Sequence, residues 1–463
     1  MSNAAFSSWP NSLWKSDSLT HSFEHAPSQV DCDVCIVGAG YSGLWTAIQL
    51  HLIDPSKKIV IVEAVQPGFG ASGRNGGWCS AFLPMSLDAI TKASSRAEAI
   101  AMQQAMYDTV RDIGLFVAQH RIECGWAAGG TLQSATNNAH LARLQSHVDS
   151  YRAYGFGDEH ITLLSASQSI QRIDAQGTLG ATYSPDCAAV HPGQLVDGLV
   201  RQCLANDVTI YGDTRVIDIS PRCVTAQTND HLTQIHATHI VRATEGYTPT
   251  IKTSRRATVP IYSYMVATEP LPSDVWNSIG WASRETFSDA RNMVIYAQRT
   301  ADNRIAFGGR GAPYRFGSTV DSKFDISSAV HNKITSTMHS LFPSTRDALI
   351  THRWGGPLGI TRDWFSGVTL NHNTGLATLG GYVGDGVAAS YLGAKTLAHL
   401  ICDTQEPVTR LPWAQHVSRS WEPEPFRWLG INALLKVPAL SDIQEARNKS
   451  SSWLLSLLKR FTH

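Results

Sequence analysis

The sequence lacks the features that would place it in several large classes of protein. It has no net charge, because 38 Lys and Arg balance 38 Asp and Glu, and it shows no basic stripe. Nucleic-acid-binding proteins usually carry such a basic excess, so no nucleic-acid partner is expected. Charged residues make up only 16% of the chain, whereas the 43% hydrophobic residues are ordinary for a globular protein. The composition therefore indicates a folded chain with an average core.

Long hydrophobic runs are missing as well. No stretch reaches the roughly 18 apolar residues of a membrane span, so none is expected. Residues 1–29 are rich in Ser and contain no apolar segment like that of a secretory signal. The eight cysteines are scattered. We therefore predict a cytoplasmic protein with free thiols.

Two of the cysteines form a C-x-x-C motif, which is typical of redox or metal sites. Cys32 and Cys35 lie in a predicted strand, however, where residues three apart face opposite sides. We interpret the pair as structural and predict no metal site.

Glycine, in contrast, is concentrated in the ranges 38–43, 68–77 and 380–386. The first range reads Gly38-x-Gly40-x-x-Gly43 and stands between a predicted strand and a predicted helix. In a dinucleotide-binding unit the first glycine makes a tight turn, the second admits the diphosphate, and the third lets helix and strand pack closely. The N-terminus of the helix then stabilises the diphosphate.

An acidic residue completes this unit. Glu63 ends the next predicted strand, 20 residues after Gly43, where a carboxylate accepts hydrogen bonds from a ribose. A carboxylate there would repel a 2′-phosphate, which disfavours NADP. The unit itself fits NAD and FAD equally well.

The second glycine cluster favours FAD. Residues 68–77 hold five glycines where an NAD-binding domain normally returns to a helix, so the backbone is expected to wrap around a larger cofactor. Arg74 in this segment would meet a phosphate or the flavin edge, or it is a surface arginine. The third cluster opens a predicted helix over 387–402, whose N-terminus can stabilise negative charge on a flavin ring. The backbone at residues 240–246, where another predicted strand ends, is also expected to approach the cofactor closely.

Six stretches, each loose by itself, follow one another in a specific order. Together they resemble the FAD-dependent oxidoreductases of the D-amino-acid oxidase/glycine oxidase superfamily, in particular the γ-glutamylputrescine oxidase-like branch. The stretches are GAGYSGL (38–44), GASGRNGG (70–77), VHPGQLVDGL (190–199), ATEP (267–270), FGGR (307–310) and GYVGDGVAAS (381–390).

The resemblance implies an α/β fold, α+β overall, with two interleaved domains. A Rossmann-like FAD-binding domain would comprise residues 30–90, 190–257 and 366–405. A substrate domain with a large mixed or antiparallel sheet would comprise residues 91–189 and 258–365. Residues 406–463 are expected to form a helical tail.

The glycine clusters and the resemblance together predict the residues that bind FAD. The resemblance adds Val216 as a backbone contact to the adenine, and it places residues of the second cluster along the flavin. The predicted cofactor-binding residues are Gly38, Gly40, Ser42, Gly43, Glu63, Ala64, Gly70, Ser72, Arg74, Asn75, Gly76, Gly77, Val216, Thr244, Gly246, Gly381, Gly384, Gly386 and Val387.

The resemblance also implies a reaction, the oxidation of a C–N bond. An amine would give hydride to flavin N5, and the imine product would hydrolyse while O2 reoxidises the flavin. The partners are thus a small-molecule amine and either O2 or an electron carrier. An apolar pocket would lower the pKa of the amine by desolvation, so no dedicated base is required. The sequence does not distinguish a diamine derivative from an amino acid or an aminoalkylphosphonate.

No residue is assigned as catalytic, but six are candidates for the pocket: Tyr262, Tyr264, Arg310, Trp354, Tyr382 and Asp385. Each aromatic residue is also compatible with an ordinary core or surface position. Arg310 would bind a carboxylate or phosphonate, or form a structural salt bridge. Asp385 would tune the flavin or bind a cationic amine, or it caps the following helix.

Two departures from related enzymes bear on the chemistry. Sarcosine-oxidase relatives attach FAD through a Cys, and the corresponding segment 355–360 has none, so we predict non-covalent FAD. Those relatives also use a Lys above the flavin, which residues 303–308 lack. Because this lysine is missing, a dehydrogenase remains an alternative to an oxidase.

The end of the chain shows an amphipathic pattern. Residues 448–463 place five apolar side chains on one helical face. This pattern predicts a helix docked on the protein itself, with a membrane-surface helix as the alternative.

Overall fold

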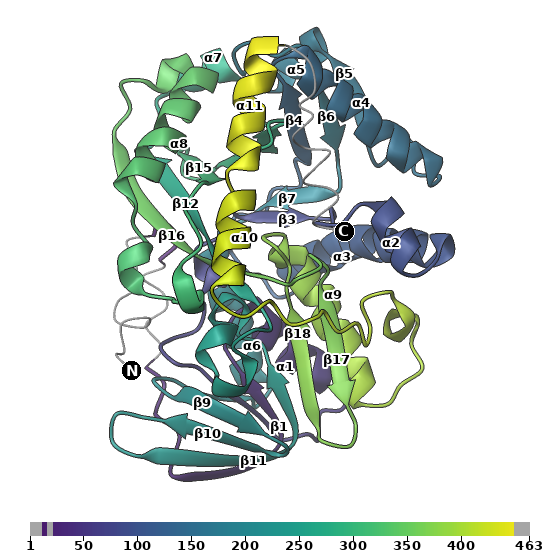
Figure 1. Ribbon diagram of the computed structural model, residues 1–463, viewed down its shortest axis with the longest axis vertical. Coiled ribbons are helices and arrows are strands. Elements are labelled where there is room, and N and C mark those ends of the chain that lie inside the picture. The colour runs from purple at the N-terminus through teal and green to yellow at the C-terminus, as the bar shows by residue number, and fades with distance from the viewer. Residues whose placement is uncertain (1–11, 16–21, 449–463) are drawn as a thin grey trace.

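The computed structural model describes residues 12–15 and 22–448 (Figure 1). The tail segment 448–463 therefore lies almost entirely outside the described residues, and its docking stays a prediction. No described helix combines the length and the apolar character that crossing a membrane would require.

The first eight-stranded sheet is built from segments far apart in the chain. β1 pairs in parallel with both β2 and β11, and its residues alternate between two apolar clusters, so both faces are buried. In spatial order its strands are β17 (Gly367–Asn371), β18 (Leu376–Gly380), β11 (Leu232–Arg242), β1 (Gln29–Val37), β2 (Ile59–Val62) and β8 (Thr209–Tyr211), with β10 (Cys223–Gln227) and β9 (Arg215–Ser220) extending from β11.

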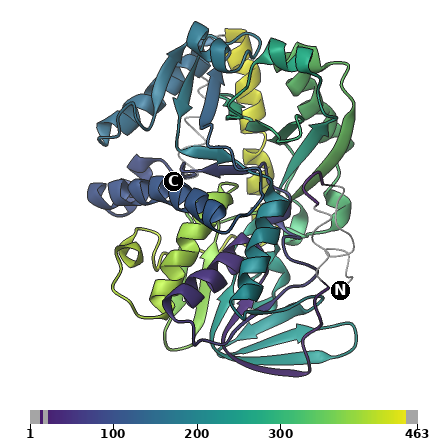
Figure 2. The same ribbon diagram turned by 180° about the vertical axis from the view of Figure 1, so that it is seen from behind.

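Helices cover this sheet on one side, as the two opposite views show (Figures 1 and 2). Its helices are α1 (Tyr41–Ile53), α6 (Pro192–Ala205) and α9 (Gly386–Ile401). α3 (Arg96–Gln119) packs on α9 within the same core, although the sequence predicted residues from 91 onward for the substrate domain.

The second eight-stranded sheet is mostly antiparallel and stands above the first in Figure 1. Its strands come from residues 131–184 and 286–360 together with the long strand β12. In spatial order they are β16 (Ile350–Ile360), β12 (Val259–Thr268), β15 (Ile305–Arg310), β14 (Ile295–Arg299), β13 (Thr286–Asp289), β4 (Thr131–Ala135), β6 (Gly180–Ser184) and β5 (Thr162–Ser165). The two sheets draw on the ranges predicted for the two domains, while the domain division itself stays a prediction.

Smaller elements complete the second half of the molecule. A two-stranded sheet of β3 (Trp78–Ser80) and β7 (Cys187–Ala189) lies between the large sheets in Figure 1. The remaining helices are α2 (Leu87–Ala93), α4 (Asn138–Ala153), α5 (Ala166–Arg172), α7 (Ser273–Ile279), α8 (Ser328–Leu341), α10 (Phe426–Leu434) and α11 (Val437–Asn448).

α2 and α3 are separate helices, because the Ser95 hydroxyl accepts a hydrogen bond from the Glu98 amide and so begins a new helix. Cys32 and Cys35, expected on opposite sides of the strand, both contact one apolar cluster beside β1, and neither forms a disulfide within the described residues.

Candidate functional site

A cavity opens where the parallel strands β1, β2 and β11 end, and we call it the first cavity. Val37, Val62 and Ala243 line it from these three strand ends. The carboxyl edge of a parallel sheet is where such folds bind their ligands. Of the predicted cofactor-binding residues, fourteen line this cavity: Gly38, Gly40, Ser42, Glu63, Ala64, Gly70, Ser72, Asn75, Val216, Thr244, Gly246, Gly384, Gly386 and Val387.

The N-terminus of α1 faces this cavity with few competing partners. Gly40 is the N-cap residue and has no side chain to bind the first-turn N–H groups. Within the described residues, the Tyr41 N–H alone among the first-turn groups is satisfied by another segment, through the Ser72 hydroxyl at 2.8 Å. The other free N–H groups and the helix dipole are therefore available to a diphosphate.

The Glu63 carboxylate is held at the edge of the same cavity. It accepts hydrogen bonds from the backbone N–H groups of Ala39 at 2.8 Å and of Val65 at 3.1 Å. Two donors fix its orientation while lone pairs remain for further donors. The arrangement suits recognition of a ribose diol.

Three predicted glycines act through packing and do not line either of the two cavities described here. A β-carbon on Gly43 would lie 2.0 Å from the carbonyl oxygen of Gly38. On Gly77 and Gly381 it would lie 1.9 Å from the Gln298 amide nitrogen and 2.5 Å from a Thr361 methyl carbon. These positions therefore let neighbouring segments approach closely.

A second cavity adjoins the first and lies under β14 and β15. Both cavities are lined by Asn75, Leu358 and Gly384, together with Ala71 and Val387. A group that fills the first cavity would thus form one wall of the second. The polar side chains of the second cavity include Arg310, Asp385 and Tyr296, whose hydroxyl lies 2.8 Å from that of Ser263.

Asp385 and Arg310 supply opposite charges to the second cavity. Asp385 holds the N-cap position of α9, yet its side chain makes no capping hydrogen bond. Burial raises the pKa of Asp385 to about 6, and the Arg310 guanidinium opposes that rise. Arg310 donates to the Val383 carbonyl at 2.5 Å and forms no salt bridge within the described residues, so the structural-salt-bridge alternative is not observed.

Arg74 is buried rather than exposed on the surface. Its Nη1 donates to the Asp325 carboxylate at 2.7 Å, and its guanidinium lies 4.5 Å from the centroid of the Phe69 ring. It lines the second cavity, as does Gly76. Within the described residues its buried Nε and Nη2 have no hydrogen-bond partner, which is costly unless a bound group accepts from them. These orphaned donors, the free first-turn N–H groups of α1 and the apolar first cavity all fit FAD.

Three predicted pocket residues lie elsewhere. Tyr262 and Tyr264 share one side of β12, which packs toward α8, and their hydroxyls donate to the carbonyls of Asp321 and Phe324. Ser263, between them, lines the second cavity instead. Trp354 is fully buried and donates to the Arg74 carbonyl at 2.9 Å. Tyr382 lines the first cavity, and its hydroxyl lies 3.1 Å from that of Ser42.

Glu245 is a functional candidate that the sequence interpretation passed over. It follows β11, lines the first cavity, and accepts a hydrogen bond from the Gly381 N–H at 2.9 Å. It thereby joins the end of β11 to the third glycine cluster. Burial raises the pKa of Glu245 to about 7, although backbone N–H groups and Arg242 oppose the rise. The only signal for it in the sequence was an acidic residue three positions after the end of an apolar strand.

The Glu245→Gln variant is expected to change how stability depends on pH. The folded-state pKa lies above the value near 4.3 of an unfolded chain, so this carboxyl contributes less stability as the pH rises from about 4 to about 7. Because glutamine does not ionise, the variant should not lose stability in this way as the pH rises. The unfolding free energy of the variant relative to wild type should therefore rise by about 2 kcal/mol between pH 5 and pH 8.

Urea unfolding at the two pH values measures this difference. Glu123→Gln, at an exposed carboxylate, is the matched control and should show the same difference at both pH values. A pH-independent difference for Glu245→Gln would contradict the assignment.

Comparison with known proteins identifies the family of the chain. Residues 33–400 match the family described as FAD dependent oxidoreductase (DAO). The γ-glutamylputrescine oxidoreductase of Escherichia coli K12 is 27% identical over 381 residues, covering 82% of this chain and 85% of that protein. The probable oxidoreductase OrdL of Haemophilus influenzae is 24% identical and covers 84% of this chain and 88% of its own length.

A solved structure shows the same fold. Glycine oxidase from Geobacillus kaustophilus superposes with a TM-score of 0.68 at 19% identity, covering 84% of this chain and all of that one. The family match spans both large sheets and all three glycine clusters, and it confirms the predicted fold class and cofactor. The chain therefore belongs to the DAO family of FAD-dependent oxidoreductases.

Proposed function

We propose that this oxidoreductase is an amine oxidase that removes hydride from the carbon next to a primary or secondary amine. Bound FAD would supply the hydride acceptor, N5; water then hydrolyses the imine to a carbonyl compound and ammonia, or a primary amine where the substrate is a secondary amine, while O2 is reduced to H2O2. The observation that carries the proposal is the second cavity, which adjoins the FAD cavity and presents both Asp385 and Arg310.

Asp385 is placed to handle the charge of the amine. An amine enters largely as its ammonium form but must be neutral to release hydride. Because the pKa of Asp385 is about 6, its carboxylate is ionised at neutral pH and can hold the ammonium and accept one of its protons. The surrounding desolvation lowers the pKa of the amine and favours the same transfer.

Arg310 and the Tyr296–Ser263 pair orient the rest of the substrate. Arg310 Nη2 donates a hydrogen bond to the Val383 carbonyl. The other N–H groups of its guanidinium can donate to a carboxylate or phosphonate oxygen. The two hydroxyls supply a further donor or acceptor from β14 and β12. Amino acids, diamine derivatives and aminoalkylphosphonates are all compatible with this set.

The test is an anaerobic screen in which amines and amino acids are added to the FAD-loaded enzyme. A substrate should bleach the flavin absorbance near about 450 nm, and admitting air should restore it with release of peroxide. If no compound bleaches the flavin, the proposal is wrong. Asp385→Asn should lower kcat/KM for the amine by about tenfold or more, which is the loss of one charge-assisted hydrogen bond.

A dehydrogenase is the second candidate, because the described β15 and the turn before it contain no lysine where related oxidases have one. In that case an amine bleaches the flavin, air restores it only slowly, and a quinone or carrier restores it rapidly. The same experiment therefore separates the two activities.

A further inference from the structure

A third cavity, of about 350 Å³, adjoins the second one. One of its walls is the second sheet, through β4 and β6, and the opposite wall comes from residues 78–87 and from α4. A cavity of about 150 Å³ is already large enough for benzene, so this one has room for an aromatic ring. Large apolar and aromatic side chains form the wall opposite the sheet: Trp78, Phe82, Leu83, Met85 and Tyr151.

The second and third cavities lie on the same face of this sheet. Four residues line both of them: Trp78, Gln133, Ser288 and Asp385. Gln133 stands opposite Ser288 of β13 and opposite Thr182 of β6, and residues opposite one another in paired strands face the same side. A substrate with its amine beside Asp385 can therefore extend along this face into the third cavity without crossing the sheet.

The third cavity offers no counter-charge to a second charged group on the substrate. Within the described residues, Asp385 is the only member of its lining that is charged at neutral pH. Burial lowers the pKa of His147, so its ring is neutral and belongs to the aromatic wall, 5.0 Å from the ring of Tyr151 and 5.6 Å from that of Phe82. A distal carboxylate or ammonium would thus lose its hydration without gaining a partner.

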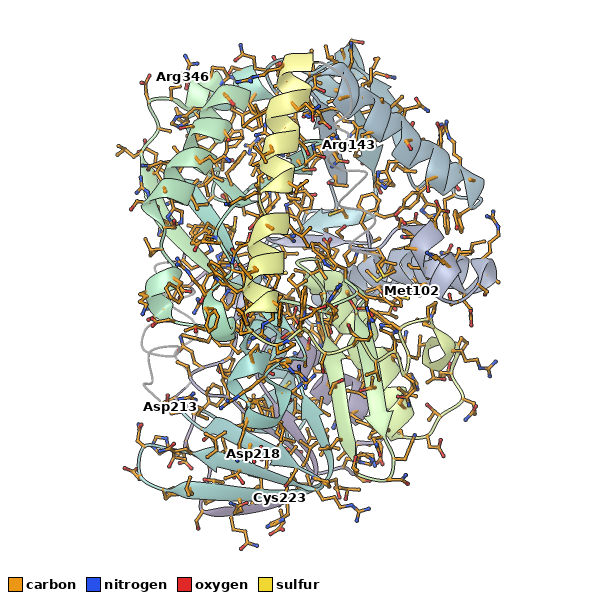
Figure 3. All side chains as sticks on the ribbon, viewed as in Figure 1. Met102, Arg143, Asp213, Asp218, Cys223 and Arg346 are labelled. Carbon is orange, nitrogen blue, oxygen red and sulfur yellow. The ribbon has the colours of Figure 1, made fainter. Side chains whose placement is uncertain are left out.

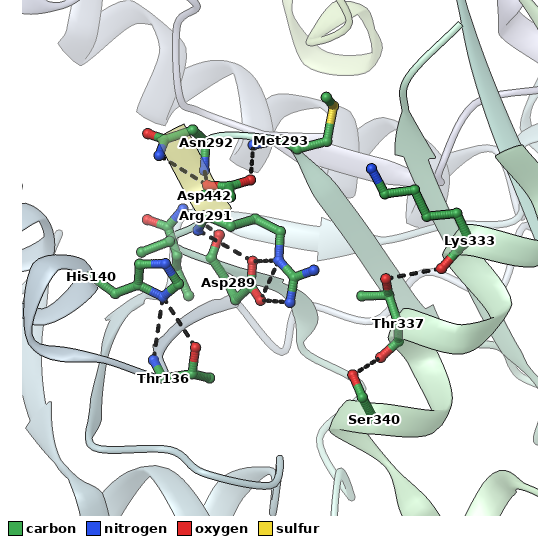
Figure 4. A network of polar contacts seen from close by, with 12 residues as sticks. Thr136, His140, Asp289, Arg291, Asn292, Met293, Lys333, Thr337, Ser340 and Asp442 are labelled. Atoms are coloured by element: carbon green, nitrogen blue, oxygen red, sulfur yellow. Dashed lines mark hydrogen bonds and ion pairs between the residues drawn. The ribbon is translucent and has the colours of Figure 1, made fainter. Parts of the chain in front are cut away.

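The cations around the two cavities are paired or face elsewhere. Arg143, one turn before the part of α4 that lines the third cavity, lies beside α11 and pairs there with Glu445 at 2.7 Å (Figure 3). Arg291 lines the second cavity, but its Nε donates to the Asp289 carboxylate at 2.7 Å (Figure 4). Lys333, also in Figure 4, belongs to α8, which packs on the other face of the sheet.

The sheet wall of the third cavity presents uncharged hydrogen-bonding groups. Thr182 is only 5% exposed, and its hydroxyl has no hydrogen-bond partner within the described residues. The Ser288 hydroxyl likewise has none among them, and the Gln133 amide stands between the two in the strand register. A buried hydroxyl without a partner is costly unless a bound group pairs with it. This wall therefore favours an uncharged polar group such as a phenol hydroxyl.

We propose that the third cavity binds the far end of the amine substrate, and that this end is an uncharged aromatic ring whose hydroxyl faces Thr182. The inference rests on the proposed amine oxidation and narrows its substrate class to arylalkylamines. Phe82, His147 and Tyr151 pack against the ring from one side, while the hydroxyls of the sheet face its polar edge.

The test compares three amines with one skeleton: phenethylamine, tyramine and 4-(2-aminoethyl)benzoate. Wild-type kcat/KM should be at least about tenfold lower for the benzoate than for tyramine, because its charge has no partner in the cavity. Thr182→Val should lower the preference for tyramine over phenethylamine about fivefold, the loss of one neutral hydrogen bond, and Thr182→Ser should retain that preference. Ser150→Arg, which adds a cation to the α4 wall, should favour the benzoate over tyramine.

Binding without turnover provides a second readout. 4-Ethylphenol, which has no amine, should perturb the flavin spectrum, and its Kd should rise about fivefold in Thr182→Val. Thr225→Val, in β10 of the first sheet, is the matched control and should leave this Kd unchanged.

Two results would overturn the assignment while leaving amine oxidation intact. The first is a wild-type enzyme that oxidises other amines but treats tyramine no better than the benzoate. The second is a Kd for 4-ethylphenol that Thr182→Val does not change. If no amine at all bleaches the flavin, the proposed function fails and the substrate class with it, whereas the 4-ethylphenol measurement still decides whether the cavity binds an uncharged ring.

Discussion

The Gly43→Ala enzyme is expected to be purified largely without FAD. The added β-carbon would lie 2.0 Å from the Gly38 carbonyl oxygen and 3.2 Å from a methyl carbon of Ile36. The first of these is a backbone atom in the turn itself, so α1 must move away from β1. The first-turn N–H groups then no longer converge on the diphosphate. We expect a cost of at least about 3 kcal/mol, or roughly 100-fold in affinity for FAD.

The ratio of flavin to protein after gel filtration, followed by titration of the apoprotein with FAD, measures this loss. Gly430→Ala is a matched control, because a β-carbon there meets nothing within 4 Å and the residue lies in α10. Gly40→Ala should disturb the packing of α1 less than Gly43→Ala, because its β-carbon would meet only the movable Ser72 side chain, at 2.9 Å, but it should also weaken FAD binding, because it adds a side chain where the diphosphate is expected to approach the backbone. FAD binding at wild-type affinity by Gly43→Ala would refute the packing role of Gly43.

The cofactor half of the site was predictable because its signals are local. Gly38, Gly40 and Gly43 lie within one turn, and Glu63 follows at the end of the next strand, so spacing alone places them at one sheet edge. Most of the hydrogen bonds expected to the cofactor there come from backbone N–H groups. The sequence needs only to supply glycine where a side chain would block them.

The substrate half was less predictable because it depends on which side of a sheet faces the ligand. Alternation along a strand puts Tyr262 and Tyr264 on the same side of β12, but it does not say which side faces the ligand. The position of α8 decides it, and α8 packs over the tyrosines, so the cavity receives Ser263.

Contacts between segments far apart in the chain could not be predicted from sequence patterns. Glu245 meets the Gly381 N–H across 136 residues, and Arg74 meets Asp325 across 251 residues. The sequence around each of these residues does not indicate which distant residue it contacts. Asp325 lies in the connection that leads from β15 into α8, a segment with no motif.

The ion pair of Arg74 and Asp325 is expected to be the most sensitive polar contact of the second cavity. Both side chains are nearly fully buried, with 2% and 6% of their surfaces exposed. Arg74 Nη1 donates hydrogen bonds to the Asp325 carboxylate and, at 3.3 Å, to the Gly355 carbonyl. Its Nε and Nη2 have no hydrogen-bond partner in the described residues. Removing the carboxylate would leave a buried cation with only neutral acceptors.

Asp325→Ala should therefore lower the free energy of unfolding by about 3–5 kcal/mol at pH 8, the usual result of breaking a buried pair. Asp325→Asn should cost less, because its amide oxygen can still accept from Nη1. Urea unfolding of the FAD-loaded enzyme measures both, with Asp347→Ala at an exposed position as the control. If Asp325→Ala is as stable as that control, the pair does not support the fold.

A double variant separates the stability of the pair from its role in the site. Replacing a buried ion pair by apolar residues is often neutral, so Arg74→Met combined with Asp325→Ala should recover most of the stability that Asp325→Ala loses. Arg74 nevertheless lines the second cavity, and its unpaired N–H groups are available to a bound group there. The double variant should thus fold like wild type yet show an altered flavin spectrum and a lower rate of reduction by amines. Recovery of stability without either change would mean that Arg74 serves the fold alone.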